Sequence, residues 1–295
     1  MMRQPILRPA PRRRPGLERL RRRVLQPFFT RLGYDLLPAT PEWEHRPLSK
    51  REVERLLEGC ASQLRDDFAA AGIEAQEDLE RIAHDFWSLI RACPVRQRHG
   101  GNGFNGALQV YAAVRSLRPA LIVESGVFRG LTTWLMRQAA PGAAIYCFDP
   151  VLDNLHYRDA DARYFTHDWS LFDISVLDLR DSLAFFDDHI SQGQRILEAS
   201  DRGFTRLLFD DNAAAQRIHS HGGPAFPTLD MILDDGAQGE AVRWLRNGRE
   251  FIYKPDPAFV ADVRSRIAGA HDFDDGHRIT GYSPARISYV RLRPR

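Results

Sequence analysis

The second half of the chain alternates apolar runs with helical stretches, in the order expected of strand–helix–strand units. Apolar runs at 121–123 and 145–148 predict buried strands, and the residues between them have helical composition. Two later runs, 183–186 and 207–209, end directly in acidic residues. Buried strands of a parallel sheet read as continuous apolar segments of this kind. The pattern predicts an α/β, Rossmann-like domain over 99–295, with a mostly parallel sheet and helices on both faces.

The preceding residues show helical periodicity. Ser49 and Glu52 form the signature of a capping box, and apolar residues recur at helical spacing over 53–64 and 79–90. We therefore expect a helical addition over residues 46–98. These helices could cover a substrate pocket or act only as a structural cap, and the sequence favours neither.

The N-terminal segment differs from the rest in charge. Residues 1–31 hold ten arginines and one acid, Glu18, a formal charge of +9; since the whole chain carries +2, the remainder carries −7. Prolines and mutual repulsion predict a largely disordered tail over 1–45, with a short amphipathic helix at 17–29. Residues 1–31 could contact an anionic membrane or an acidic partner, or stay solvated. The negative body argues against nucleic acid as a substrate.

The composition indicates the class of protein and the compartment in which it works. Hydrophobic residues make up 43% and charged residues 27%, as in ordinary globular proteins. No apolar run approaches the roughly 20 residues of a membrane-spanning helix, and the N-terminus lacks the apolar core of a secretory signal. Cys60, Cys93 and Cys147 are too widely spaced to suggest a redox or metal pair. We expect a reducing, cytoplasmic environment.

The turn after the first predicted strand has the chemistry of a nucleoside site. Gly126 and Gly130 bracket it, so a ligand can approach the backbone at the start of the following helix. Asp149 ends the second strand, where a carboxylate can accept from a ribose diol. The spacing differs from the G-x-G-x-x-G of dinucleotide sites, and Glu124 before the first glycine suits a ligand with a cationic amino-acid group.

Acids follow two further predicted strands. Asp187 and Asp188 follow one, and Asp210 and Asp211 follow the next. Adjacent parallel strands bring such ends to one edge of a sheet, where carboxylates repel unless a cation bridges them. Oxygen ligands suit Mg²⁺ or a similar divalent ion. Helix capping by aspartate is the alternative, and the paired acids leave the register open.

These motifs together resemble those of a known family. The segment VESGVFRGLTTWLM, followed by IYCFDP, resembles motif I and the acidic second strand of class I S-adenosylmethionine (SAM)-dependent methyltransferases. The catechol-type, metal-dependent O-methyltransferases are most similar, with sugar O-methyltransferases and cephalosporin-hydroxylase-like proteins nearby. The likeness covers roughly residues 100–295 and implies methyl transfer from SAM to a small-molecule hydroxyl group, assisted by a divalent cation such as Mg²⁺.

The resemblance also implies roles for single residues. The cofactor's amino-acid side would lie along Glu124, Gly126, Phe128, Gly130 and Thr132. Its ribose would meet Asp149, and its adenine Asp168 and His189. The ion would be held by Asp188, Asp211 and Asn212, with Asp188 also serving catalysis.

The chain departs from the catechol-type pattern at the general base. That pattern has a lysine three residues after the metal-binding acid, and this chain has Ser191. His219 or His221 could take the proton instead, because imidazole titrates near neutral pH. The loss of the lysine fits a sugar or alkyl hydroxyl no worse than a catechol.

Two other functions remain open at the level of sequence. One is a cephalosporin-hydroxylase-like reaction on the same fold, for which a carboxylate site could hold iron. The other is a catalytically silent domain that binds a partner through its arginine-rich tail.

Overall fold

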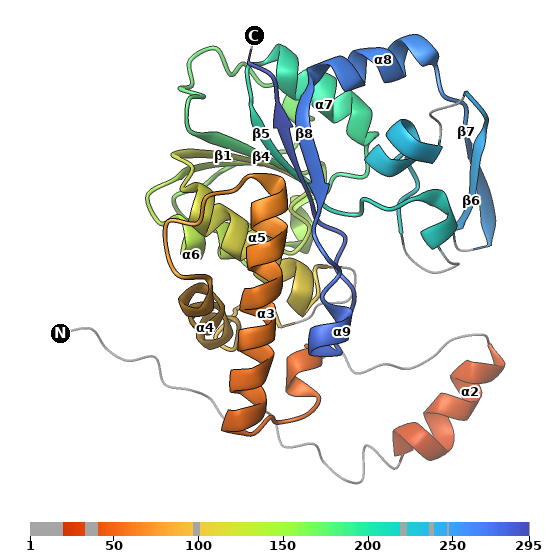
Figure 1. The fold of residues 1–295 in the computed structure, drawn as a ribbon. Coiled ribbons are helices and arrows are strands. Elements are labelled where there is room, and N and C mark those ends of the chain that lie inside the picture. The colour runs from red at the N-terminus through yellow and green to blue at the C-terminus, as the bar shows by residue number, and fades with distance from the viewer. Residues whose placement is uncertain are drawn as a thin grey trace.

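A seven-stranded sheet forms the centre of the computed structural model, which describes residues 20–32, 41–96, 101–218, 223–235, 239–246 and 248–294. Its strand order is β3-β2-β1-β4-β5-β9-β8, and Figure 1 labels β1, β4, β5 and β8 of this sheet. The strands are β1 (Leu121–Ser125), β2 (Ala144–Phe148), β3 (Arg163–Phe165), β4 (Ser182–Phe186), β5 (Arg206–Phe209), β8 (Ile267–Asp272) and β9 (Ser288–Leu292). Strands β1 to β5 are parallel, and β9 is antiparallel to both its neighbours. The predicted fold class is confirmed.

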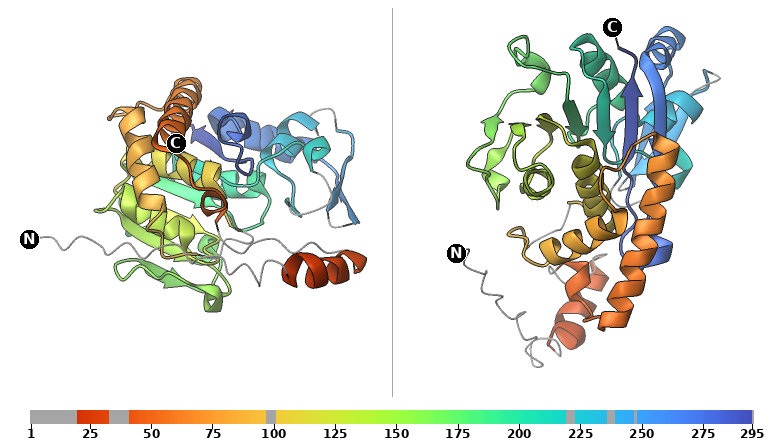
Figure 2. Two further views of the ribbon diagram at one scale, coloured as in Figure 1. Left: turned by 90° about the horizontal axis from the view of Figure 1, so that it is seen from below. Right: turned by 60° about the vertical axis from the view of Figure 1, so that its left-hand side comes forward.

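Helices cover both faces of the sheet because successive residues of its strands point to opposite sides. On one face, Ile122 of β1 packs in a core with α5 (Phe104–Leu117) and α6 (Leu131–Ala139). On the other face, Val123 packs in a second core with α7 (Gln192–Asp201) and α8 (Pro257–Arg266). Figure 2 shows this layering from two further directions.

The predicted N-terminal helices form an outer layer on the α5 side. They are α3 (Lys50–Ala71) and α4 (Leu79–Ile90). Ser49 and Glu52 form the predicted capping box, and Gly72 ends α3 in the left-handed conformation. Buried side chains of both helices belong to the same core as the first face of the sheet.

The segment after β5 differs from what its composition favours. Residues 228–245 are mostly helical in composition, but their described part contains a π-helical turn, Met231–Asp235, and the strand β6 (Val242–Arg246). Strand β6 pairs with β7 (Arg249–Tyr253) in a hairpin apart from the main sheet. In β6 the buried Val242 and Trp244 alternate with exposed residues, which is the pattern of a half-buried strand.

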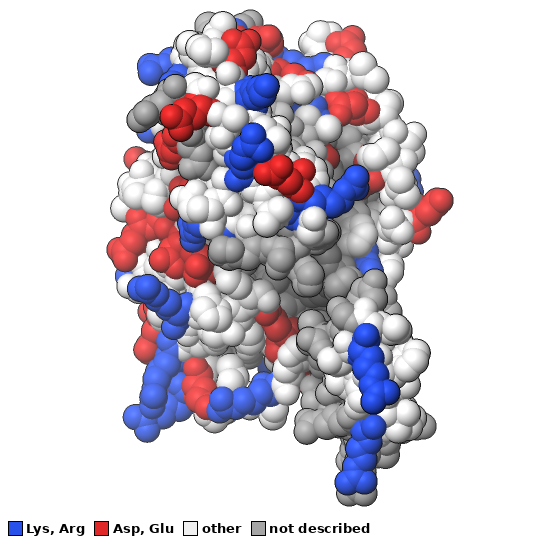
Figure 3. Space-filling view, turned by 90° about the vertical axis from the view of Figure 1, so that its right-hand side faces the viewer, with Lys and Arg blue, Asp and Glu red and all other residues white. Residues whose placement is uncertain are grey.

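The first described helix belongs to the basic N-terminal segment. Residues 21–25 form a π-helical turn that continues into α2 (Gln26–Arg31). Phe28 and Leu32 are 58% and 57% exposed. Acidic and basic side chains are interspersed over the face that carries α2 and the β6–β7 hairpin (Figure 3). Within the described ranges, no helix combines the length and apolar character needed to cross a membrane.

The remaining helical elements are short. They are the helix α9 (His277–Thr280) and the 3₁₀ turns Glu42–Glu44, Leu152–Asn154, Trp169–Leu171 and Ala215–Arg217.

Candidate functional site

The glycine turn between β1 and α6 lies close to two other backbone segments. Gly126 and Gly130 have φ angles of 94° and 81°, a region that favours glycine. A Cβ at Gly126 would lie 2.1 Å from the carbonyl oxygen of Asp187, and one at Gly130 would lie 2.2 Å from that of Tyr157. The sequence suggested that a ligand requires these glycines, but here the protein's own backbone requires them.

Asp149, directly after β2, binds the glycine turn through its carboxylate. Its Oδ2 accepts hydrogen bonds from the backbone N–H groups of Val127 (2.9 Å) and Phe128 (2.8 Å). Its Oδ1 accepts one from Val151 (2.8 Å). A carboxylate offers about four acceptor positions, so Asp149 keeps capacity for a further donor such as a ribose hydroxyl.

Glu124 lies behind the turn and is fully buried. Its Oε2 accepts hydrogen bonds from the Thr133 hydroxyl (2.5 Å) and the Cys147 thiol (3.4 Å). Burial raises the pKa of Glu124 to about 8. Glu124 therefore supports the turn from inside, and its contact with a cofactor stays a prediction. Thr132, at the start of α6, lines a small cavity beside the turn.

Three side chains at the carboxyl edge of the sheet form a group that could hold a metal ion. Asp187 follows β4, and Asp211 lies just beyond β5. The Nε2 of His189 is 4.0 Å from Asp187 Oδ1 and 3.7 Å from Asp211 Oδ2. One ligand atom from each of the three lies within 4.8 Å of the others. We call these residues the Asp–His–Asp cluster.

The backbone of this cluster is strained. His189 and Asp211 have φ angles of 60° and 62°, which few residues other than glycine adopt. Such strain persists where the surrounding structure enforces it, often at functional sites. The sequence placed His189 against a cofactor's adenine, whereas the structure places it between the two carboxylates.

Asp188 was predicted to bind the metal and lies outside the cluster. Its Oδ2 accepts hydrogen bonds from the Ser125 hydroxyl (2.6 Å) and from Arg195 Nε (2.8 Å). Neighbouring residues leave a strand on opposite sides, so Asp187 faces the cluster and Asp188 faces α7. Asp188 thus binds Ser125 and Arg195 in this structure, and its role as a metal ligand stays a prediction beside the alternative, Asp187.

Asn212 was also predicted to bind the metal, but its side chain forms hydrogen bonds to other residues. Its Nδ2 donates to Asp230 Oδ1 and to Asp272 Oδ1, both at 2.8 Å. Its Oδ1 accepts from the backbone N–H of Asp230 at 3.1 Å. The amide oxygen therefore points into this second group, away from the cluster, and the role of Asn212 as a ligand stays a prediction.

Arg195 on α7 connects the acids behind the site. Its side chain is only 2% exposed and forms ion pairs with Asp168 (2.6 Å), Asp188 (2.8 Å) and Glu198 (2.6 Å). Burial would raise the pKa of Asp168, but hydrogen bonds from Arg195 and Ser170 outweigh it and lower this pKa to about 2. Asp168 thus binds Arg195 in place of the predicted adenine amino group.

The negative charges of the acids after β4 and β5 disfavour one another. Burial raises the pKa of Asp187 well above its usual range, and the charges of Asp210 and Asp211 add to this effect. Burial and the charge of Asp211 likewise raise the pKa of Asp210 to about 7, against the lowering effect of hydrogen bonds from Asp211 and Asn102. Protonation or a bound cation would relieve this repulsion.

A cavity of about 520 Å³ opens in front of the Asp–His–Asp cluster. Its other walls are formed by Asp210 and 283–286, together with Gly101, Asn102, Gly103, Gly106, Gly223 and Arg246. A much smaller cavity, about 20 Å³, lies between the glycine turn and residues 101–102. Asn102 and Asp187 line both cavities, so the turn and the cluster face a common space.

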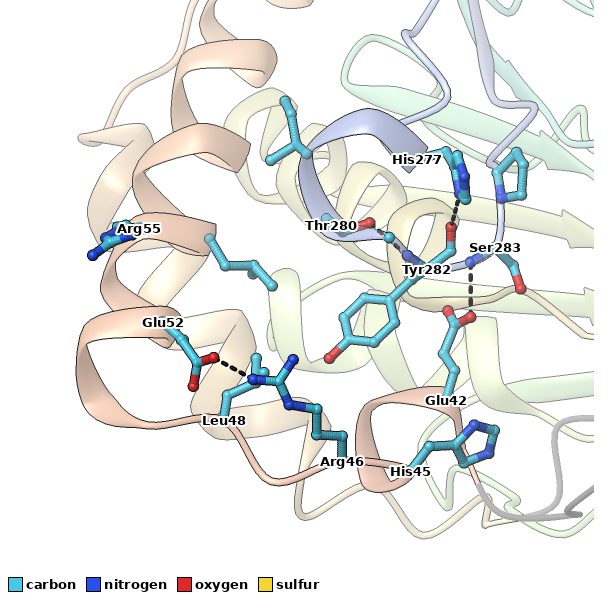
Figure 4. A pocket seen from close by; sticks show the side chains of 14 residues that line it. Glu42, His45, Arg46, Leu48, Glu52, Arg55, His277, Thr280, Tyr282 and Ser283 are labelled. Carbon is cyan, nitrogen blue, oxygen red and sulfur yellow. Dashed lines mark hydrogen bonds and ion pairs between the residues drawn. The ribbon is translucent and has the colours of Figure 1, made fainter.

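A further cavity of about 830 Å³ lies on the other side of Ser283 and Pro284 (Figure 4). Glu42 separates it from the cluster cavity and holds two walls together. Its Oε1 accepts from the backbone N–H of Phe104 (2.7 Å), and its Oε2 accepts from that of Ser283 (2.8 Å). Residues just before α3 therefore position the wall of the candidate site.

Some predicted residues have no described position, and some residues of the site were not predicted from the sequence. His219 and His221 lie outside the described residues. Sequence reasoning missed Arg195, Arg246 and Arg286, because no local motif surrounds them. Asp187 was named only as an alternative to Asp188.

Comparisons with known proteins give matches in structure. No protein-family model and no curated protein matches the sequence. Matching solved structures include EvdMO1, with 12% identity, a TM-score of 0.37 and coverage of 66% of this chain and 43% of that one. The structure described as cmcI-N160 SAH has 18% identity, a TM-score of 0.31 and coverage of 40% and 64%. The SAH-bound Podospora anserina methyltransferase PaMTH1 has 10% identity, a TM-score of 0.39 and coverage of 84% and 98%.

This chain thus matches less than two thirds of the length of the first two structures. Identities and TM-scores as low as these carry no argument about activity. Any statement of function has to rest on the residues of the site.

Proposed function

We propose that this protein transfers a methyl group from SAM to a hydroxyl group of a small molecule, with the help of a divalent cation. The observation that carries the proposal is the contact between the glycine turn and the segment after β4. Gly126 packs directly on the backbone of Asp187. The turn and the Asp–His–Asp cluster therefore adjoin between β1 and β4, where the strand order reverses. Open α/β sheets bind ligands at such a switch point.

The residues around the turn suit SAM chemically. Asp149 keeps acceptor capacity beside the turn, and Thr132 offers a hydroxyl group nearby. The space is the opposing consideration, because sites for ligands of this size measure about 300–1,000 Å³. The cavity beside the turn measures about 20 Å³. We therefore expect residues 101–102 to move away from the turn when SAM binds.

The cluster suits a divalent cation. Two carboxylates and one imidazole form a mixed set of oxygen and nitrogen ligands. The carboxylates suit Mg²⁺, and the added imidazole makes Mn²⁺, Fe²⁺ and Zn²⁺ further candidates. Ligand atoms around one ion at bonds of about 2.1 Å lie about 3–4.2 Å apart. The separations of 3.7 and 4.0 Å at His189 fall in this range.

In this proposal the chain's residues position the reactants. SAM held at the turn would supply an electrophilic methyl group: its carbon would bond to the acceptor oxygen, and the electron pair of the broken C–S bond would stay on sulfur, giving S-adenosylhomocysteine (SAH). A cation held by the Asp–His–Asp cluster would lower the pKa of the acceptor hydroxyl. Asp187, His189 and Asp211 hold the acceptor end, and Asp149 orients the glycine turn at the cofactor end. His219 or His221 remains the proposed base for the released proton.

Methyl transfer can be tested without knowing the acceptor. The full chain is incubated with methyl-labelled SAM, Mg²⁺ or Mn²⁺ and a metabolite extract, and labelled products are detected by mass spectrometry. We expect labelled product that chelation of the divalent ion reduces. An Asp187→Asn variant that labels as much product as the unaltered chain would refute the role of the cluster.

A further inference from the structure

The cavity in front of the Asp–His–Asp cluster is lined by residues of both charges. Carboxylates lie at the ends of β4 and β5, while Arg246 ends β6 and Arg286 precedes β9. The two arginines come from elements that are far apart in the sequence. The fold therefore brings two basic residues to the cavity that also holds the cluster.

Arg246 has unused capacity to donate hydrogen bonds. Within the described part of the chain, its buried Nε has no hydrogen-bond partner. A buried donor without an acceptor costs roughly 1–3 kcal/mol, so such groups are usually matched by a partner or a ligand. Arg246 also lines the cavity, so a rotation of its side chain would bring this donor to an anionic ligand group there.

Arg286 adds positive charge on the same side. Its charge acts on Asp210, the carboxylate just before the cluster's Asp211. Three carboxylates line this cavity: Asp187, Asp210 and Asp211. A divalent cation would neutralise two of their three negative charges. The two guanidinium groups would then outnumber the remaining negative charge, which favours an anion in the cavity.

The remaining lining residues have small side chains. Gly101, Gly103, Gly106 and Gly223 line the cavity, and among the described lining residues there is no phenylalanine, tyrosine or tryptophan. Binding of an aromatic acceptor normally uses apolar and aromatic side chains. A sugar-like or hydroxy-acid body, rich in hydroxyl groups, fits these walls better.

We propose that the acceptor is a hydroxylated anion of about monosaccharide size, with its carboxylate or phosphate bound by Arg246 and Arg286 and its hydroxyl group at the Asp–His–Asp cluster. This inference rests on the proposed methyl transfer for the identity of the bound molecule as acceptor. The charged site itself can be tested without it.

The test measures equilibrium binding by calorimetry in buffer containing Mg²⁺ and no SAM. The probes are D-glucuronate and D-glucose 6-phosphate, with D-glucose as the neutral analogue. We expect at least one anion to bind about tenfold or more tightly than glucose, consistent with a charge-assisted bidentate contact. The two anions distinguish a carboxylate from a phosphate. Glucose binding as tightly as both anions, or no binding of either anion, would overturn the proposal.

Variants then assign the binding to the arginines. Arg246→Gln and Arg286→Gln should each weaken the preferred anion several-fold. Arg243→Gln is the matched control, because Arg243 lies on the same strand, pairs with Glu250 and is exposed. Equal losses in all three variants, or none, would contradict the assignment. SAM binding is measured separately: anion binding without SAM binding would refute the methyl transfer alone, and SAM binding without anion binding would refute this inference alone.

Discussion

One residue position decides which acid belongs to the candidate metal centre. Asp187 and Asp188 follow the same strand, yet Asp187 faces His189 and Asp211, and Asp188 binds Arg195. The difference follows from strand geometry, in which consecutive side chains leave on opposite sides. The two acids therefore have separate roles, which replacing each of them in turn with asparagine can distinguish.

Asp187→Asn should weaken binding of Mn²⁺ by more than about a hundredfold, because it replaces a charged carboxylate ligand with a neutral amide. Asp188→Asn keeps all three ligands and weakens only the contact with Arg195 behind them. The affinity for Mn²⁺ should therefore fall about tenfold, as for other residues that hold metal ligands in place. Mn²⁺ titrations of both variants make the comparison. A variant at Asp188 that loses all binding, beside one at Asp187 that keeps it, would show that Asp188 is the ligand.

The buried Glu124 makes the stability of the fold depend on pH. Its pKa rises from 4.5 to about 8 on folding, so the folded chain holds the proton more tightly than the unfolded chain. The contribution to stability is complete below about pH 4.5 and is lost as the pH rises towards 8. Glu124→Gln should flatten this decline in urea-denaturation curves measured between pH 5 and 9. Glu58→Gln, at an exposed position of α3, is the control; an unchanged slope in Glu124→Gln would contradict the assignment.

At the scale of elements, α7 holds the candidate site from behind. Arg195 reaches Asp188 at the end of β4 and Asp168 at the end of the β3 segment. Ser125, the last residue of β1, shares the Asp188 carboxylate. One buried guanidinium thus links a helix to the two strands that carry the glycine turn and the cluster.

Arg195→Met should destabilise the chain by about 1–3 kcal/mol, since it removes the cation shared by Asp168, Asp188 and Glu198, of which Asp188 is the most buried. It should also weaken Mn²⁺ binding, because the segment that carries Asp187 and His189 loses its anchor. Thermal denaturation and Mn²⁺ titration measure the two effects. Arg180→Met, which breaks the exposed pair with Asp178, should change neither. Unaltered metal affinity in a folded Arg195→Met protein would confine Arg195 to a structural role.

The elements that sequence predicted well are those with local signals. The capping box at Ser49 and the continuous apolar strands β4 and β5 were recognisable without tertiary context. The β6–β7 hairpin was missed because its alternation spans few residues. Arg195 was missed because its partners lie 7 and 27 residues away, where no motif connects them. The paired acids could not be assigned, since their direction depends on where each strand ends.

At the scale of the whole molecule, charge divides the chain in two. The first 31 residues carry +9 and the remainder −7. The described part of the basic segment forms a helix with exposed apolar side chains, including Val24 (56%) and Phe28 (58%). Contact with an anionic membrane remains a prediction, which the composition of this helix supports.

Vesicle sedimentation tests that prediction. The full chain should sediment with vesicles of phosphatidylcholine and phosphatidylserine more than with phosphatidylcholine alone, and salt should reduce the difference. Replacing Val24 and Phe28 with aspartate should remove the sedimentation. Val176→Asp, at an 82% exposed position of the sheet domain, should leave it unchanged. Equal sedimentation of all forms would exclude this helix as the contact.

The central claim is that a SAM site adjoins the Asp–His–Asp cluster at the switch point of the sheet. Calorimetric titration of SAM into the full chain in the presence of Mg²⁺ tests it most directly. We predict saturable binding to one site, with a dissociation constant in the range of about 1 μM to 1 mM that is typical of enzyme substrates, and loss of that binding in Asp149→Ala. Absence of saturable binding, or binding that Asp149→Ala leaves unchanged, would contradict the account.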